Sequence, residues 1–300
     1  MRLVRTVTAL REALAPARLQ ELRIGLVPTM GALHEGHLSL IERARQDCDV
    51  VVVSLFVNPA QFNERGDLDR YPRDEERDAE LAASRGADLL FAPPAEEVYP
   101  DGFATAVEVL GVTERLEGQA RGPGHFRGVT TIVTKLLCMA QPDVAYFGQK
   151  DAQQVVVIRR LVTDLNLPVA IEALPTVREA DGLAMSSRNE LLSPSERVRA
   201  LALSAGLREA ERLRAAGERA APALLAAVRS ELERAEVEPE YVALVDGETL
   251  EPLAHVHDGA LLAVAARVGD VRLIDNVVLG AAAPMEDPTP TGKASETCSA

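Results

Sequence analysis

Two histidines three positions apart, His34 and His37, lie in the run P-T-M-G-A-L-H-E-G-H at residues 28–37. The run follows an apolar stretch and precedes a helical pattern, which predicts a strand, a turn and the first turn of a helix. Backbone N–H groups and the positive end of the dipole make such a helix start a phosphate site. Gly31 and Gly36 would let a nucleotide approach the backbone, and the imidazoles could donate to its phosphates. Two surface histidines or half of a metal site are the alternatives.

A second candidate segment, F-G-Q-K-D at residues 147–151, also follows an apolar stretch and opens a helical pattern. Its lysine, Lys150, is one of only three in the chain, against 29 arginines. A compact ammonium group suits a phosphate oxygen in a tight site. The carboxyl end of a parallel strand is where open α/β sheets bind ligands. The alternative is an ordinary ion pair with Asp151 at the start of the helix.

A third segment, D-G-L-A-M-S-S-R-N at residues 181–189, lies where the alternation of predicted strands and helices gives way to long predicted helices. Ser186, Ser187 and Arg188 would offer donors to a triphosphate from a mobile loop. The alternative is a polar linker between domains, which loops rich in Ser and Gly often are.

Carboxamides near these segments could hold a hydroxy acid without adding charge. Asn58 and Gln61 follow the stretch at 50–57, and Gln153 and Gln154 follow Lys150. The charged residues 63–78 could be a solvated loop, although their place beside Gln61 would suit a lid. For His125 and Arg127, in the glycine-rich stretch 118–128, a structural turn is the favoured interpretation.

Strands that alternate with helices must position these groups. Apolar stretches at 23–28, 50–57, 88–92, 144–147 and 169–174 predict strands, and periodic stretches at 7–20, 38–44, 74–85, 129–139 and 152–165 predict helices. Such alternation predicts an α/β fold, a Rossmann-like, doubly wound parallel sheet.

Beyond residue 176 the pattern becomes that of a small α+β domain. Long helices are predicted at 194–216 and 221–235, followed by strands at 241–245, 260–266 and 271–276. We therefore predict a nucleotide- and substrate-binding domain over residues 1–176 and a smaller domain over 177–280 that carries the M-S-S-R loop. Residues 281–300 gather Pro, Thr, Ser and Gly and are predicted to form a disordered tail.

Composition limits the classes of partner. A formal net charge of −14 disfavours nucleic acid, because a phosphate backbone is bound by a basic surface. No apolar run approaches the length of a membrane span, so no membrane partner is expected. The three cysteines form no C-x-x-C pattern, which favours a reducing compartment, and we expect the cytoplasm.

Taken together, seven ordered motifs resemble the pantothenate synthetase (pantoate–β-alanine ligase) family of the nucleotidylyltransferase superfamily, over about residues 3–280. They are P-T-M-G-A-L-H-E-G-H at 28–37, F-V-N-P-x-Q-F at 56–62, Y-P-R at 71–73, L-E-G at 116–118, G-H-F-R-G-V at 124–129, F-G-Q-K-D-x-Q-Q at 147–154 and P-T-V-R-E-x-D-G-L-A-M-S-S-R-N at 175–189. One departure is the stretch 121–126, in which Gly122 is one residue more than the usual R-P-G-H-F.

The resemblance implies a homodimeric enzyme that converts pantoate and MgATP to pantoyl adenylate and pyrophosphate, after which β-alanine attacks the adenylate to give pantothenate and AMP. It implies His37, His34, Lys150 and Arg188 as catalytic groups, with His37 the usual acid, and Gln61 and Gln154 as pantoate ligands, to which we add Asn58. The ATP site would comprise Met30, Gly31, Ala32, Leu33, His34, Glu35, Gly36, His37, Gly148, Gln149, Lys150, Asp151, Val177, Met185, Ser186, Ser187 and Arg188.

Two alternatives stand beside this interpretation. Another nucleotidylyltransferase, which moves AMP onto a phosphorylated cofactor precursor, would share the histidine motif, but there is no reason for it to carry both Gln61 and the M-S-S-R loop in this spacing. A non-catalytic nucleotide-binding module would be expected to have lost His34, His37 or Lys150, and all three are present.

Overall fold

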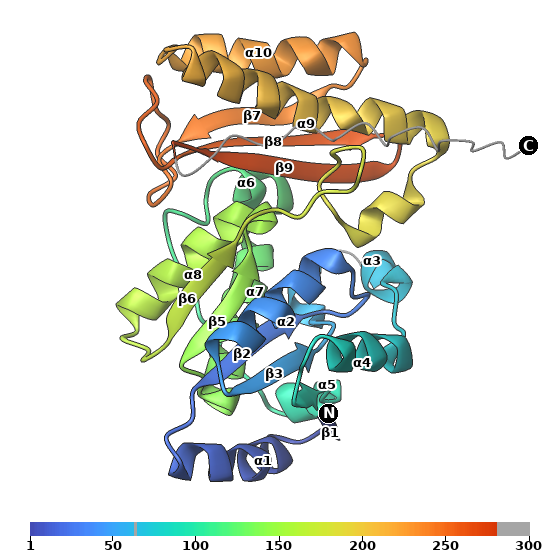
Figure 1. The fold of residues 1–300 in the computed structure, drawn as a ribbon, viewed down its shortest axis with the longest axis vertical. Coiled ribbons are helices and arrows are strands. Elements are labelled where there is room, and N and C mark those ends of the chain that lie inside the picture. The colour runs from blue at the N-terminus through green and yellow to red at the C-terminus, as the bar shows by residue number, and fades with distance from the viewer. Residues whose placement is uncertain (63–64, 281–300) are drawn as a thin grey trace, which may run out of the picture.

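A computed structural model describes residues 1–62 and 65–280 of the chain. It contains a six-stranded parallel sheet with helices on both faces and, stacked above it, a three-stranded antiparallel sheet covered by two long helices (Figure 1). The predicted fold class, a Rossmann-like α/β sheet followed by a smaller α+β unit, is confirmed. The predicted tail at 281–300 lies outside the described residues.

The parallel sheet has the strand order β1-β4-β3-β2-β5-β6. Its strands are β1 (Arg2–Val4), β2 (Ile24–Thr29), β3 (Val50–Leu55), β4 (Leu89–Phe91), β5 (Val144–Gly148) and β6 (Ala170–Leu174). From β2 the chain adds β3 and β4 on one side and then β5 and β6 on the other. The order therefore reverses between β2 and β5, and a crevice at the carboxyl ends of these two strands is where doubly wound sheets bind ligands.

Helices cover both faces because side chains of successive strand residues point to opposite faces. Leu26 and Ala145 pack in the cluster that includes α1 (Val7–Leu19), α7 (Pro123–Ala140) and α8 (Ala152–Asp164). Val27 and Tyr146 pack in the cluster that includes α2 (Glu35–Asp47) and α4 (Glu75–Ser84). Burial on both faces explains why the central strands are almost continuously apolar.

The glycine-rich stretch 118–128 is helical, so the turn predicted for His125 and Arg127 is wrong. Helix α6 (Glu117–Arg121) ends at Gly122, and α7 begins at Pro123, six residues before the predicted start. Gly128 is required by packing: a Cβ there would lie 2.3 Å from the backbone oxygen of Ala60. Close approach of two backbones, which sequence periodicity does not reveal, accounts for the glycine.

Residues 65–78 are also more ordered than the predicted solvated loop. They include the short helix α3 (Arg65–Arg70) and the start of α4. Strand β1 and helix α5 (Ala95–Val98) were not predicted, because stretches of three and four residues are too short to show a period.

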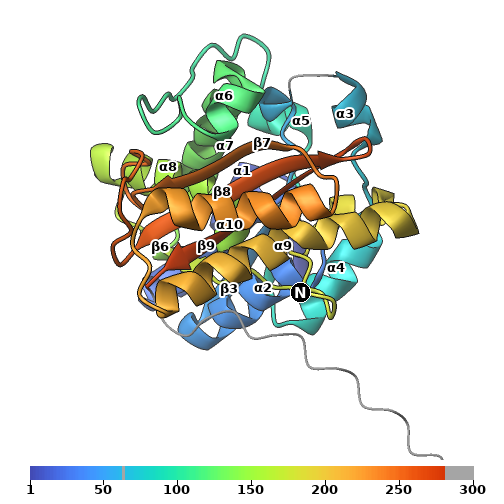
Figure 2. The same cartoon turned by 90° about the horizontal axis from the view of Figure 1, so that it is seen from above.

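The C-terminal unit is built from α9 (Pro194–Ala215), α10 (Ala221–Arg234), β7 (Pro239–Val245), β8 (Ala260–Val268) and β9 (Val271–Leu279). Viewed from above, α9 and α10 lie over the strands (Figure 2). Leu262 and Val264 face these helices, whereas Leu261 and Ala263 join the core of the parallel sheet. The antiparallel sheet is therefore buried on both faces. None of the helices in the described part of the chain is both long and apolar enough to cross a membrane.

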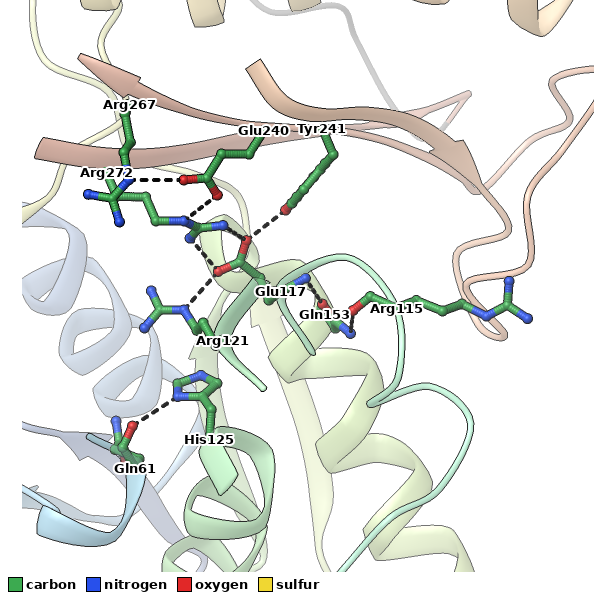
Figure 3. A network of polar contacts seen from close by, with 10 residues as sticks. All are labelled: Gln61, Arg115, Glu117, Arg121, His125, Gln153, Glu240, Tyr241, Arg267 and Arg272. Atoms are coloured by element: carbon green, nitrogen blue, oxygen red, sulfur yellow. Dashed lines mark hydrogen bonds and ion pairs between the residues drawn. The ribbon is translucent and has the colours of Figure 1, made fainter. Parts of the chain in front are cut away.

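A buried ionic network joins the two units (Figure 3). The carboxylate of Glu117 on α6 accepts hydrogen bonds from both terminal nitrogens of Arg272 on β9, at 2.7 and 2.8 Å. It also accepts from Nε of Arg121 and from the hydroxyl of Tyr241 on β7, each at 2.9 Å. Burial alone would raise the pKa of the Glu117 carboxyl, but the two guanidinium groups lower it to about 2.

We predict that Glu117→Gln lowers the free energy of unfolding by about 3 kcal/mol at neutral pH, because Arg272 loses its buried partner. The folded pKa lies below the ordinary 4.5, so this contribution is present above pH 4.5 and is lost as the pH falls toward 2. Urea unfolding from pH 7 downward should show wild type and variant converging below pH 4.5.

Glu240→Gln is the matched control, because Glu240 also binds Arg272 but its side chain is 29% exposed. It should cost less than about 1 kcal/mol. Equal losses in the two variants would contradict a special role for Glu117.

Candidate active site

Strands β2 and β5 pair only near their amino ends. Within the described chain the two strands are joined only through Gly25 with Val144 and Leu26 with Ala145, whereas β2 pairs with β3 along its whole length. The carboxyl halves of β2 and β5 are therefore not hydrogen-bonded to each other. The segments that follow them, residues 30–37 and 149–154, contain most of the predicted site residues.

The loop after β2 has a strained backbone that a buried carboxylate holds in place. Gly31 and Ala32 have φ values of 90° and 52°, in the left-handed region. Asp78 on α4, only 1% exposed, accepts hydrogen bonds from the backbone N–H groups of Ala32 and Leu33, each at 2.8 Å. A Cβ on Gly31 would lie 2.8 Å from Leu55 and 2.9 Å from the Asp78 carboxylate. Glycine is therefore required at this position both by its φ and by the space around it.

His34 and His37 close the first turn of α2. His34 is the N-cap, and its Nδ1 accepts a hydrogen bond from the Gly36 N–H at 3.1 Å. The Nδ1 of His37 accepts from the His34 N–H at 3.4 Å. Because both Nδ1 atoms are acceptors, each neutral ring carries its proton on Nε2. The pair therefore retains two Nε2–H donors for a ligand.

The same surroundings keep both histidines uncharged. Burial, together with the positive charge of Lys150, lowers the pKa of His34 to about 4. Burial and the neighbouring His34 ring, whose centroid is 4.2 Å away, lower the pKa of His37 to about 3. At neutral pH these rings act as neutral donors in the unliganded protein.

Lys150 lies close enough to the histidines to influence both. Its positive charge lowers, and the negative charge of Asp151 raises, the pKa of each imidazole. The two residues belong to the 3-10 turn η2 (Gln149–Asp151), which leads from β5 into α8. In the described part of the chain, Lys150 and Asp151 form no ion pair with each other. The alternative interpretation of Lys150 as a helix-start salt bridge is therefore not supported.

The amides after β3 form a supported pair. Asn58 is 1% exposed, and its Nδ2 donates to Oε1 of Gln61 and to the carbonyl of Gly128. Its Oδ1 accepts from the Tyr99 hydroxyl and the Ala60 N–H. Asn58 thus has no free hydrogen-bonding group and acts by holding the Gln61 side chain.

Gln61 itself faces the first loop. Its Nε2 lies 3.0 Å from Sδ of Met30, and its backbone oxygen lies 3.1 Å from Nδ1 of His125, as Figure 3 shows for the latter pair. The predicted substrate ligand is therefore fixed from both its backbone and its side chain.

The two glutamines of α8 differ in environment. Gln153 is buried; its carboxamide accepts from the Glu117 N–H and donates to the carbonyls of Val112 and Arg115. Gln154 is half-buried, and its carboxamide has no hydrogen-bond partner among the described residues. Gln153 is therefore structural, and Gln154 is available to a ligand.

The M-S-S-R loop emerges from a hairpin. Val177 and Met185 pair through a 2.9 Å backbone hydrogen bond, and Glu179 N–H donates to the Leu183 carbonyl. The chain then enters the 3-10 turn η3 (Ser187–Leu191), with Ser186 as its N-cap. The negative charge of Glu179 raises the pKa of His34. The hairpin therefore lies near the two histidines.

Tyr71, from the Y-P-R motif, contacts the same loop. Burial raises the pKa of the Tyr71 phenol. The positive charge of Arg188 and a hydrogen bond with the Ser187 side chain lower it. The segment predicted as a solvated loop or lid therefore touches the M-S-S-R loop.

The loop after β2, the η2 turn and the hairpin before η3 thus lie near the two histidines, but two contributors were not predicted. Asp78 supports the loop after β2, and His125 holds the backbone of Gln61. On the predicted helix 74–85, Asp78 lies one turn before Ala82 and therefore on the same face. That spacing could have indicated that the Asp78 carboxylate is buried. Nothing in local sequence connects His125 with Gln61.

The chain is similar to known proteins over nearly its whole length. The model of the family described as pantoate-beta-alanine ligase matches residues 2–278. The chain is 56% identical over 280 residues to the pantothenate synthetase of Moorella thermoacetica, covering 93% of this chain and 99% of that protein. It is 56% identical over 283 residues to pantothenate synthetase 1 of Bradyrhizobium diazoefficiens, covering 93% and 98%.

Solved structures give the same result. The crystal structure of pantothenate synthetase from Thermus thermophilus superposes with a TM-score of 0.87 at 49% identity, covering 93% of this chain and 99% of that one. A pantoate-beta-alanine ligase from Francisella tularensis, complexed with beta-gamma ATP and beta-alanine, superposes with a TM-score of 0.76 at 34% identity, covering 93% and 97%.

We predict that Asp78→Asn weakens binding of a nucleoside triphosphate about tenfold or more, a loss of about 1.4 kcal/mol. The amide keeps the shape of the carboxylate but has one oxygen, so the N–H of Ala32 or Leu33 loses its acceptor. Isothermal titration calorimetry with ATP measures the effect. Asp74→Asn, which preserves an exposed N-cap on the same helix, should bind as the wild type does; an unchanged affinity in folded Asp78→Asn would refute the role.

Proposed function

The chain belongs to the pantoate–β-alanine ligase family, and we propose that it condenses pantoate with β-alanine through a pantoyl adenylate, releasing pyrophosphate and AMP. The observation that carries this proposal is the convergence of His34, His37 and Lys150 at the crevice between β2 and β5. A ligase that activates an acid with ATP must stabilise negative charge on departing pyrophosphate, and these groups are cations or hydrogen-bond donors.

In the first step the pantoate carboxylate attacks the α-phosphorus of ATP, and the bond to the bridging oxygen of pyrophosphate breaks. The Nε2–H groups of His34 and His37 donate to phosphate oxygens, and Lys150 supplies a full positive charge. Arg188 adds a second charge from the M-S-S-R loop. Burial lowers the pKa of both histidines in the unliganded protein, so the rings meet the nucleotide as neutral hydrogen-bond donors.

Around these groups we assign the remaining ATP contacts to the two loops and the hairpin. They are Met30, Gly31, Ala32, Leu33, Glu35, Gly36, Gly148, Gln149, Asp151, Val177, Met185, Ser186 and Ser187. The Nε2–H groups of the two histidines that cap α2 suit phosphate, and the glycines allow close approach.

Gln61 and Gln154 are assigned to pantoate, since neutral amides can donate to its oxygens while the carboxylate is aligned for attack. Asn58 is reassigned to support Gln61, because its own carboxamide is fully hydrogen-bonded. In the second step the amine of β-alanine attacks the acyl carbon and AMP leaves. Gln61, which lies beside Met30, is assigned to both acids.

Mg²⁺ is expected to enter with the nucleotide, since magnesium in such sites is usually bound through substrate phosphates and one or two carboxylates. No group of three His, Cys, Asp or Glu side chains in the described chain could hold a metal by itself, which is compatible with this arrangement. The resemblance also implies a homodimer. The cysteine pattern supports a cytoplasmic location, with Cys48 and Cys138 both unpaired.

We predict that the protein catalyses exchange between ATP and labelled pyrophosphate only when pantoate is present. AMP should accumulate when β-alanine is added. The assay is run across a panel of small acids that lack one or both pantoate hydroxyls. Exchange that proceeds without pantoate, or equally well with an unrelated acid, would overturn the substrate assignment and favour another nucleotidylyltransferase.

We predict that Lys150→Ala lowers this exchange by about 10²-fold or more, because charge on the leaving pyrophosphate loses its nearest cation. The melting temperature and circular dichroism should stay close to wild type, since Lys150 has no ion-pair partner among the described residues. Arg160→Ala, which removes an exposed cation from the same helix region, is the control. Near wild-type exchange in Lys150→Ala would refute its phosphate role.

A further inference from the structure

Strand β9 contacts two segments that carry residues assigned to ATP under the proposed function. It packs against both η2, which contains Lys150, and η3, which follows the M-S residues. Residues of β9 alternate between two faces: Leu273 packs under α9 and α10, whereas Arg272 and Val278 face the N-terminal unit. Asp275 and Asn276, adjacent on this strand, therefore point to opposite faces.

Asn276 reaches the backbone beside Lys150. Its side-chain Nδ2 donates to the carbonyl of Gln149 at 3.0 Å and to the carbonyl of Lys150 at 2.8 Å. The residue is only 5% exposed, and its Oδ1 has no hydrogen-bond partner among the described residues. A buried acceptor without a partner costs free energy, so stability alone would not favour asparagine here. What the side chain contributes is the pair of donated hydrogen bonds.

Asp275 performs the corresponding task on the other face. Its carboxylate receives two hydrogen bonds from Arg178, at 2.7 and 3.0 Å, and Arg178 also donates to the carbonyl of Gly182. Both charged side chains are largely buried, with 17% and 2% exposed. The hairpin that presents the M-S-S-R loop is therefore fastened to the residue next to Asn276.

We infer that Asn276 is a positioning residue for adenylation: from the C-terminal unit it holds the 149–151 turn so that Lys150 faces the histidine site. The inference rests on the proposed function for its catalytic consequence. In this role Asn276 acts through the backbone carbonyls of Gln149 and Lys150. Because Asp275 holds the hairpin from the same strand, β9 sets the distance between Lys150 and the M-S-S-R loop.

The test compares Asn276→Ala and Asn276→Asp with Leu273→Ala in pantoate-dependent exchange between ATP and pyrophosphate. Aspartate keeps the shape of asparagine but cannot donate to a carbonyl, so both Asn276 variants should lose about 10–100-fold in kcat, as expected for misplacement of a catalytic group. The KM for pantoate should change little. Leu273→Ala removes a buried side chain from the other face of β9 and should lower the melting temperature without this loss in kcat.

Combination with Lys150→Ala separates positioning from general destabilisation. If Asn276 acts through Lys150, then Asn276→Ala should cost little in the Lys150→Ala background. The same fold-loss in both backgrounds would overturn the inference, as would wild-type kcat in Asn276→Asp.

Hydrogen–deuterium exchange gives a readout that does not depend on activity. Backbone amides of residues 149–152 should exchange faster in Asn276→Ala than in wild type. In Leu273→Ala their exchange rates should be the same as in wild type. Unchanged protection of this segment in Asn276→Ala would overturn the inference even if activity fell. A wild-type protein without pantoate-dependent exchange would instead refute the proposed function, and the protection data would still decide whether Asn276 holds the turn.

Discussion

The reversal of strand order between β2 and β5 is the constraint on which the site depends. The two strands pair at only two positions, so their carboxyl ends separate and the segments after them border a common crevice. The segment after β2 begins α2, whose first backbone N–H groups are capped by His34 and His37, so the donors left for a ligand are the Nε2–H groups of these neutral rings. The protein thereby gains donors for an anionic ligand before any charged side chain is considered.

The histidines are adapted to this setting. They serve as helix caps through Nδ1, which directs the remaining proton of each ring to Nε2. Burial and the nearby Lys150 keep both rings neutral, so a site for a polyanion does not accumulate several buried positive charges when it is empty. Lys150 and Arg188 each provide a positive charge. The distance between these two side chains depends on β9 of the C-terminal unit, which contacts both segments. A chain of net charge −14 can thus bind a triphosphate, because the local field in the crevice is set by these few groups.

The two units are coupled by buried polar contacts whose loss would lower the free energy of unfolding. Glu117 is surrounded by donors from α6, β7 and β9 (Figure 3), and Asp275 and Asn276 hold the hairpin and the η2 turn. Each is a buried group whose partner lies far away in sequence, and removing one partner would leave the other unsatisfied. These contacts fix the orientation of the antiparallel sheet over the crevice, and with it the geometry of the phosphate-binding loops.

The sequence by itself determined the fold class and the family, and it supplied the residues to which the chemistry is assigned in our proposal. Apolar stretches and local periodicity predicted most of the helices and every strand of the parallel sheet except β1, and the motifs around His34, Gln61, Lys150 and Ser186 identified the family. It could not show that the stretch 118–128 is helical, because Gly128 is required by close contact with Ala60 and not by a turn. Nor could it show that Asp78, His125 and Asn276 support these motifs, since each acts through a hydrogen bond to a backbone group distant in sequence. Tertiary structure alone decides such pairings, because they depend on where the chain returns in space and leave no period in the sequence.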